Sequence, residues 1–133
     1  MPKEWFFQRH GKPVIDSGRV HLDFRVKEVR ERASAILKRV ISRYHLGYIK
    51  IDYNLELSYG TEFQADSPAD GMLQHNREYL AWLEEEHAKY PEVVFENCGS
   101  GGLRMDYGML CGANAKLGGD GLPCVTEDGL GRR

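Results

Sequence analysis

The segment YIKIDYN, residues 48–54, places three polar side chains where chemistry could be done. Lys50, Asp52 and Asn54 alternate with apolar residues, and because side chains alternate between the two faces of a strand, these three share one face. A cation, a carboxylate and an amide are costly to bury without partners. The pattern indicates either a structural ion pair or a reactive carboxylate at the end of a buried strand.

A second polar group follows the apolar run VVFEN, residues 93–97. Cys98 precedes a loop rich in glycine, which lets the backbone approach a ligand closely or adopt a positive φ. The glycine spacing fits neither of the common phosphate-binding motifs. It favours a small polar pocket lined by Cys98 and main-chain N–H groups, with a plain glycine-rich turn as the alternative. Glu96 and Asp106 are further carboxylates near this segment.

Carboxylates at the ends of two strands of one sheet indicate glycoside hydrolysis, which uses a pair of Asp or Glu side chains flanking the scissile bond. Metal-assisted chemistry is the competing interpretation, because carboxylates at strand ends also bind Mg²⁺. The histidines are spread over expected loops and helices without ligand spacing: His10, His21, His45, His75 and His87. We therefore expect them to be exposed or structural.

Hydrophobic periodicity predicts that strands and helices alternate along the chain. Strands are expected near residues 20–24, 47–52 and 93–97, and helices near residues 27–45 and 70–89. Gly47 is the expected C-cap of the first helix. This order implies consecutive parallel strands with right-handed crossovers. Since a closed barrel needs eight such units, the predicted fold class is α/β, a partial (β/α)8 TIM barrel of about three units over residues 1–111.

Composition excludes several classes of partner. The net charge of −2, from 18 basic and 20 acidic residues, gives no electrostatic case for a nucleic-acid or membrane partner. No apolar run approaches the length of a membrane span, and the first residues lack the pattern of a signal peptide. Three cysteines without a CxxC pair leave an odd thiol, which favours a reducing compartment. We expect a cytoplasmic protein.

Residues 112–133 differ in composition from the preceding chain. They are glycine-rich and lack the periodicity of either helix or strand. We expect this tail to be poorly ordered, or to be the frameshifted end of a gene fragment.

These segments together resemble the catalytic barrel of glycoside hydrolase family 36, the retaining α-galactosidases. YIKIDYN is similar to the family's Y-I-K-W-D-x-N, with Ile51 in place of Trp. VVFENCGSGGLRMDYGML is similar to its E-x-C-x-S-G-G-x-R-x-D-x-G-M-L, and GRVHLDF resembles G-R-x-Q-x-x-L-D in compressed form. The resemblance covers roughly residues 5–110 in consistent order.

Carried over position by position, the resemblance implies that Asp52 is the nucleophile, with a covalent glycosyl-enzyme as intermediate. The implied galactose-binding positions are Arg19, Lys50, Asn54, Cys98, Gly99, Ser100 and Gly101. The implied substrate is an α-galactoside oligosaccharide, and no metal or other cofactor is needed. The oligomeric state of the parent enzyme, and the choice between galactoside hydrolysis, N-acetylgalactosaminide hydrolysis and galactosyl transfer, stay open.

One part of the family pattern is not matched. The general acid/base motif is not found in residues 112–133, and Asp106 corresponds to a different element of the family. The family's earlier barrel strands would precede residue 1. We therefore expect the chain as given to be inactive or nearly so. A metal-assisted barrel enzyme and a catalytically inactive sugar-binding remnant are the alternatives.

Overall fold

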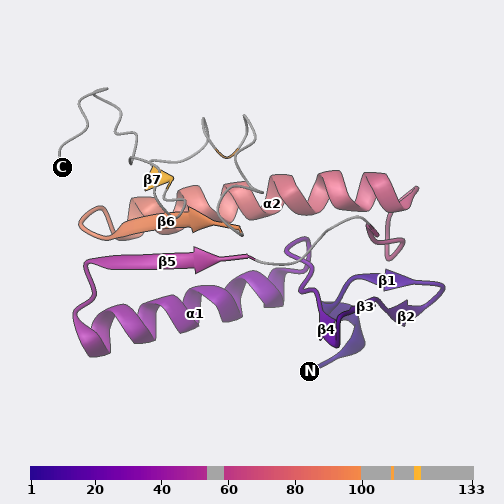
Figure 1. Cartoon of the computed structure of the whole chain (residues 1–133), viewed down its shortest axis with the longest axis horizontal. Coiled ribbons are helices and arrows are strands. Elements are labelled where there is room, and N and C mark those ends of the chain that lie inside the picture. Colours follow the sequence, from indigo (N-terminus) through magenta and orange to yellow (C-terminus); the bar gives the residue numbers. More distant parts are fainter. Residues whose placement is uncertain (54–58, 100–108, 110–115, 118–133) are drawn as a thin grey trace. The chain divides into compact units, whose positions relative to one another are not determined.

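The structure is a computed structural model that describes residues 1–53, 59–99, 109 and 116–117. Contacts between Cα atoms divide the chain into two compact units. The first comprises Met1–Lys38 and Glu56–Trp82, and the second Arg39–Leu55 and Leu83–Arg133. The two long helices, α1 (Lys27–Tyr44) and α2 (Pro68–Lys89), contribute residues to both units (Figure 1). Both agree closely with the predicted ranges.

The first unit begins with a short 3₁₀ helix and two antiparallel hairpins. The elements are η1 (Lys3–Trp5), β1 (Gln8–Arg9) with β2 (Lys12–Pro13), and β3 (Ile15–Asp16) with β4 (Arg19–Val20). Each hairpin turns through two residues with positive φ, which are His10-Gly11 and Ser17-Gly18. Positive φ at both central positions matches the right-handed twist of the flanking strands and closes a tight hairpin.

The prediction of a parallel strand at residues 20–24 is wrong. Val20 pairs antiparallel with Ile15, and Leu22 forms an antiparallel bridge with Phe6. An alternating pattern does not distinguish parallel from antiparallel pairing. Here the Ser17-Gly18 turn provides a partner only a few residues away, which costs less loop-closure entropy than a long crossover.

A loop segment ahead of α2 is tied to β1. The Gln8 N–H donates to the hydroxyl of the fully buried Thr61 at 3.1 Å, and the Glu62 N–H donates to the Gln8 carbonyl at 2.9 Å. The Glu62 carboxylate accepts from the main-chain N–H of His10 and from Arg9, which lowers the pKa of Glu62. This segment is thereby fixed where it enters the helix.

Helix α2 begins with an N-cap residue followed by a proline. Pro68 occupies the first helical position, and the hydroxyl of Ser67 accepts from the Asp70 N–H at 3.1 Å, as an N-cap does. Gly71 allows the loop to approach closely, because a Cβ at this position would lie 2.2 Å from the Thr61 carbonyl oxygen. The helix ends at Lys89, before Pro91, as expected.

Helix α1 ends in a left-handed cap, but Gly47 is not its residue. His45 has φ of 51°, and the Leu46 N–H donates to the Ile41 carbonyl at 3.4 Å, which is the six-to-one bond of a Schellman motif. Gly47 does not have a positive φ and lies in the connection to the next strand. The glycine prediction is therefore wrong by two residues, since an imidazole-bearing residue takes the position that glycine usually occupies.

The second unit contains a parallel sheet in the order β5-β6-β7, formed by β5 (Tyr48–Asp52), β6 (Val94–Cys98) and β7 (Lys116–Leu117). Strands β5 and β6 run side by side in the same direction (Figure 1). These two confirm the predicted parallel pair. Over the described residues the sheet is open, and a closed barrel is not formed.

Strand β7 is the one element that the structure describes within residues 112–133. Lys116 and Leu117 pair in parallel with Glu96 and Asn97, although the sequence there carries no strand pattern. A two-residue strand needs only a main-chain partner, so it leaves no periodic signal. The rest of that tail, and with it the prediction of poor order, lies outside the described residues.

Each unit has its own buried side chains. In the first, the rings of the buried Phe7 and the half-buried Phe24 each meet the buried His75 ring edge to face, with centroid distances of 4.8 Å and 5.8 Å respectively. Tyr79 and Trp82 extend this cluster along α2, and the Trp82 indole donates to Ser34 of α1 at 2.9 Å.

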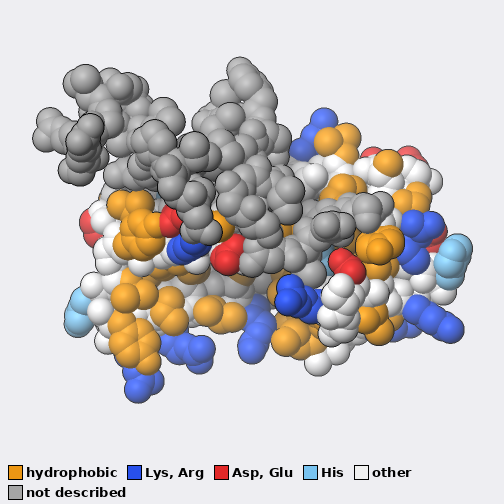
Figure 2. Space-filling view, viewed as in Figure 1, with side chains coloured by type: hydrophobic (Ala, Val, Ile, Leu, Met, Phe, Trp, Pro, Cys, Tyr) orange, Lys and Arg blue, Asp and Glu red, His pale blue; other side chains and the backbone are white. Residues whose placement is uncertain are grey.

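In the second unit, Leu83, Val93 and Phe95 are buried, and His87 of α2 packs against the ring of Phe95. Burial lowers the pKa of His87. In Figure 2, orange apolar side chains are also visible over the end of α1 and the start of β5, where Tyr44 and Tyr48 are exposed.

Candidate active site at the edge of the parallel sheet

The end of β5 and the end of β6 bring two predicted site residues together. Asp52 and Cys98 are the last residues of their strands and are Cα partners in the parallel register. The Tyr53 N–H donates to the Cys98 carbonyl at 2.9 Å and carries the ladder one residue further. Asp52 is exposed, whereas Cys98 is 5% exposed and is a free cysteine. The two residues therefore share one edge of the sheet, as the predicted order of consecutive parallel strands requires.

Two residue pairs back from this edge, Lys50 is the Cα partner of Glu96. The Lys50 Nζ lies 3.8 Å from Oε1 of Glu96, and the two side chains are 39% and 10% exposed respectively. A carboxylate buried to this degree needs a compensating charge. The ion pair supplies it, so Lys50 and Glu96 form one electrostatic unit beneath the strand ends.

The exposure of β5 alternates as the sequence predicts. Tyr48, Lys50 and Asp52 are exposed, while Ile49 and Ile51 are half-buried. In β6 the four residues from Phe95 to Cys98 are all buried. Lys50 and Asp52 therefore project from the exposed face of β5, and the neighbouring strand β6 is more buried.

The remaining predicted site residues are placed less completely. Gly99 directly follows β6 and is buried. Asn54, Ser100 and Gly101 lie outside the described residues. So does Asp106, the carboxylate that follows the glycine-rich loop. Arg19 belongs to the first unit, where it is exposed in β4 opposite Asp16.

The sequence indicated Glu96 only as a nearby carboxylate and did not place it in the site. Its position two residues before Cys98 puts it on the same face of β6, so the alternation within VFENC was the signal available. The alternation could not show which residue Glu96 pairs with. Pairing with Lys50 depends on the register between two strands that are more than 40 residues apart in sequence.

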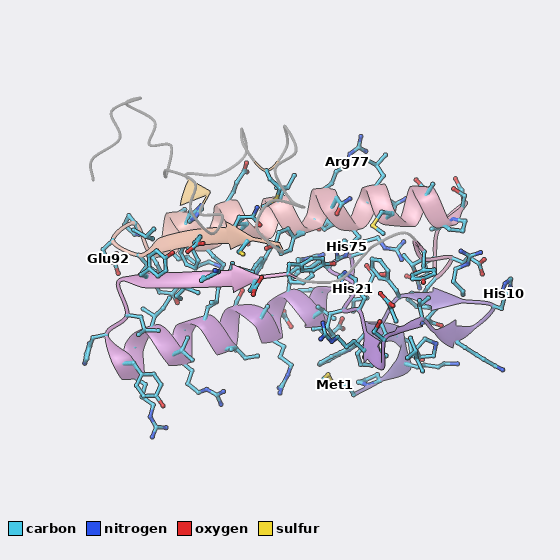
Figure 3. The ribbon with its side chains drawn as sticks, viewed as in Figure 1. Met1, His10, His21, His75, Arg77 and Glu92 are labelled. Atoms are coloured by element: carbon cyan, nitrogen blue, oxygen red, sulfur yellow. The ribbon has the colours of Figure 1, made fainter. Side chains whose placement is uncertain are left out.

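The first unit holds a second polar cluster that the sequence did not predict. The Arg25 guanidinium binds both carboxylate oxygens of Asp23, with Nη2 2.6 Å from Oδ2, and Nδ1 of His75 lies 3.7 Å from Oδ1. Burial alone would raise the pKa of Asp23, but the hydrogen bonds that it accepts from the guanidinium and the main-chain N–H of Arg25 outweigh burial and lower the pKa to about 2. His21 lies beside His75, as the labelled side chains in Figure 3 show.

A cavity of about 750 Å³ also lies in this unit and is lined by charged and amide side chains. Its charges are largely paired within the unit, since Arg25 binds Asp23 and Arg30 binds Glu78 at 2.9 Å. These contacts indicate a structural role for the cluster.

Two features of other protein classes are missing from the described residues. Among them, no group of three or more His, Cys, Asp or Glu side chains could hold a metal ion. Within the same part of the chain, no helix is both long and apolar enough to cross a membrane.

Comparison with known proteins links the chain to carbohydrate-active enzymes. The family model described as Melibiase matches residues 3–126. Alpha-galactosidase Mel36A from Lactobacillus acidophilus is 29% identical over 100 residues, which are 74% of this chain and 14% of that protein. The bifunctional alpha-galactosidase/sucrose kinase AgaSK from Mediterraneibacter gnavus is 30% identical over 108 residues, or 80% of this chain and 11% of that protein.

Solved structures of similar proteins share the fold. A GH36 alpha-galactosidase AgaA variant from Geobacillus stearothermophilus, crystallised with stachyose, matches with a TM-score of 0.70 at 19% identity. It covers 86% of this chain and 16% of the AgaA chain. The alpha-galactosidase from Lactobacillus brevis matches with a TM-score of 0.65 at 26% identity, over the same shares of the two chains. The chain therefore spans only about one sixth or less of the proteins that it matches.

Proposed function

The chain belongs to the Melibiase family of GH36 α-galactosidases, and from this membership we propose that it is part of the catalytic domain of a retaining α-galactosidase. In this proposal the parent enzyme hydrolyses terminal α-galactosyl residues of oligosaccharides, and Asp52 is the nucleophile. Relatives crystallised with stachyose and raffinose support this class of substrate.

The observation that carries the proposal is the pairing of Asp52 with Cys98 at the ends of two parallel strands. The carboxyl ends of parallel strands are where barrel enzymes place their reacting groups. Asp52 is exposed there, so an incoming sugar could reach its carboxylate. Lys50, on the same face, favours the ionised carboxylate that a nucleophile requires.

The proposed reaction has two steps. The Asp52 carboxylate attacks the anomeric carbon and displaces the glycosidic oxygen, which takes a proton from a second carboxyl group. Water, deprotonated by that same group, then attacks the anomeric carbon and releases galactose and the Asp52 carboxylate. We expect the residue that supplies this second carboxyl group to lie outside roughly residues 5–110, the region that carries the strand motifs.

Sugar contacts are proposed for the residues around the nucleophile. Lys50 offers hydrogen-bond donors to ring hydroxyls, and the buried Cys98 with Gly99 leaves room for the sugar against the main chain. The other galactose-binding positions that the resemblance implies are Asn54, Ser100 and Gly101, and Arg19 of the first unit.

A second candidate function is binding of α-galactosides without turnover. The observation that favours it is in the sequence, because residues 112–133 do not contain the acid/base motif of the family. A site that has its nucleophile but lacks its acid/base would bind sugar and turn over very slowly.

A galactosyl fluoride separates these candidates. Fluoride leaves without a proton donor, so a competent nucleophile becomes glycosylated even where the acid/base is absent. We expect mass spectrometry of the full chain to find a galactosyl group on the peptide that contains Asp52. Asp52→Asn should abolish the label, and Asp16→Asn should retain it.

Other outcomes are equally informative. A label on another residue would show that the nucleophile assignment is wrong. A folded chain that binds galactose without becoming labelled would favour the binding function. Dependence of labelling on a metal, tested by adding EDTA, would favour the metal-assisted alternative.

A further inference from the structure

We propose that Glu96 is a positioning residue that holds the Lys50 ammonium over the face of the sheet where Asp52 lies. This inference rests on the proposed function, because it assigns Lys50 a galactose contact. It adds a residue whose contribution is made through Lys50 and not through the sugar itself.

The register of the sheet places the three side chains. Lys50 and Glu96 are Cα partners, and Asp52 follows Lys50 by two residues on the same face of β5. Partners in a parallel ladder project to the same side of the sheet. Glu96 is therefore a direct lateral neighbour of Lys50 on the face that carries the proposed nucleophile.

Lys50 and Glu96 differ in the conformational freedom of their side chains. Glu96 has a side chain 10% exposed, within a strand whose last four residues are buried. The Lys50 side chain is 39% exposed and has a flexible four-carbon stem, so it would lose more rotamer freedom than Glu96 on being fixed. Glu96 is thus the fixed partner, and its charge defines where the ammonium resides.

The distance suits this role. At 3.8 Å from Nζ to Oε1, the pair lies within ion-pair range but beyond a direct hydrogen bond. Charge attraction therefore confines the ammonium to a region without demanding one orientation of its N–H groups. An ammonium confined in this way can turn its donors toward a ligand hydroxyl.

A double-mutant cycle tests whether Glu96 acts through Lys50. D-galactose is titrated into the full chain and binding is followed by NMR, using Glu96→Gln, Lys50→Met and the double variant. We expect Glu96→Gln to weaken binding about fivefold. In the Lys50→Met background the same change should have little effect, because there is no ammonium left to hold. Glu96→Asp should restore part of the affinity.

A second measurement does not depend on the sugar. Charge attraction without a direct hydrogen bond still restricts the motion of the Lys50 side chain, and ¹³C relaxation of its Cε methylene reports that motion. We expect this motion to be more restricted in the wild type and in Glu96→Asp than in Glu96→Gln. Glu92→Gln serves as the control, since Glu92 is an exposed carboxylate in the connection before β6.

The outcomes distinguish this inference from the proposed function. If the wild type binds galactose and Glu96→Gln binds equally well, the positioning role is overturned while the proposed function stands. An equal loss of affinity in both backgrounds would overturn it too, because a general structural effect does not require Lys50. If the folded wild type binds no galactose, the proposed function fails, and the role of Glu96 in it fails also.

Discussion

The Nε2 atom of His75 lies 3.3 Å from the Nε2 atom of His21, and the main-chain N–H of Phe24 donates to Nδ1 of His75 at 3.0 Å. A ring nitrogen that accepts a hydrogen bond carries no proton. Nδ1 of His75 is therefore unprotonated, and its Nε2–H donates to His21. His21 must then carry its own proton on Nδ1.

This arrangement predicts two opposite tautomers in one pair of rings. At neutral pH, ¹⁵N chemical shifts should show His75 with its proton on Nε2 and His21 with its proton on Nδ1. The same tautomer in both rings would contradict the hydrogen-bond assignment.

Asp23 predicts a loss of stability in acid. Its pKa falls from the usual 3.8 to about 2 in the folded chain, so the folded state binds the proton less readily than the unfolded state. The contribution to stability, roughly 2 kcal/mol, is fully present above about pH 5 and is lost as the pH falls toward 2.

Chemical denaturation between pH 6 and pH 2 measures this effect. Asp23→Asn should lower stability at neutral pH, because the buried Arg25 guanidinium is left without its carboxylate, and should flatten the acid limb. Asp66→Asn, at an exposed position, is the control that should do neither. An unchanged acid limb in Asp23→Asn would refute the assignment.

The lowered pKa of His87 predicts that the stability of the folded chain also depends on pH near neutrality. Burial against Phe95 lowers the pKa of His87, so the unfolded chain takes up a proton at a higher pH than the folded chain does. Stability that is fully present above about pH 7 should decrease as the pH falls through 6.5 and below. His87→Phe should remove this dependence while keeping the ring contact, which thermal unfolding at pH 7.5 and 5.5 can measure.

Gly71 predicts a large effect from one methyl group. A Cβ there would lie 2.2 Å from the Thr61 carbonyl oxygen, a contact that only a shift of the main chain could relieve. Gly71→Ala should therefore lower the free energy of unfolding by about 2 kcal/mol or more. Gly47→Ala is a matched control, since nothing lies within 4 Å of its Cβ position. Equal thermal stability of the two variants would count against the close approach.

Local signals in the sequence were sufficient for much of the fold. Ser67-Pro68 marks the start of α2, and the alternation in residues 48–52 gives both the strand and the face that carries Asp52. The location of Asp52 and Cys98 at one edge of the sheet also followed, because successive parallel strands end at the same edge. These features depend on residues close together in sequence or on a general topological rule.

The features that were missed depend on particular long-range or conformational choices. The Ser17-Gly18 turn makes a local hairpin from a pattern that suited a parallel strand equally well. His75 meets Asp23 from a helix 52 residues later, and no spacing in the sequence encodes that meeting. The left-handed His45 takes a position where glycine is the usual expectation.

The hydrogen bonds between β5 and β6 fix the distance between the strand ends independently of the side chains at those positions. The distance between the backbones at Asp52 and Cys98 is maintained by main-chain hydrogen bonds, which include the 2.9 Å bond from the Tyr53 N–H to the Cys98 carbonyl. Side chains at these two positions can therefore be exchanged without changing the separation of their attachment points. An engineered acid, amide or thiol at either position would inherit the same spacing, which makes the strand ends a scaffold for installing other chemistry.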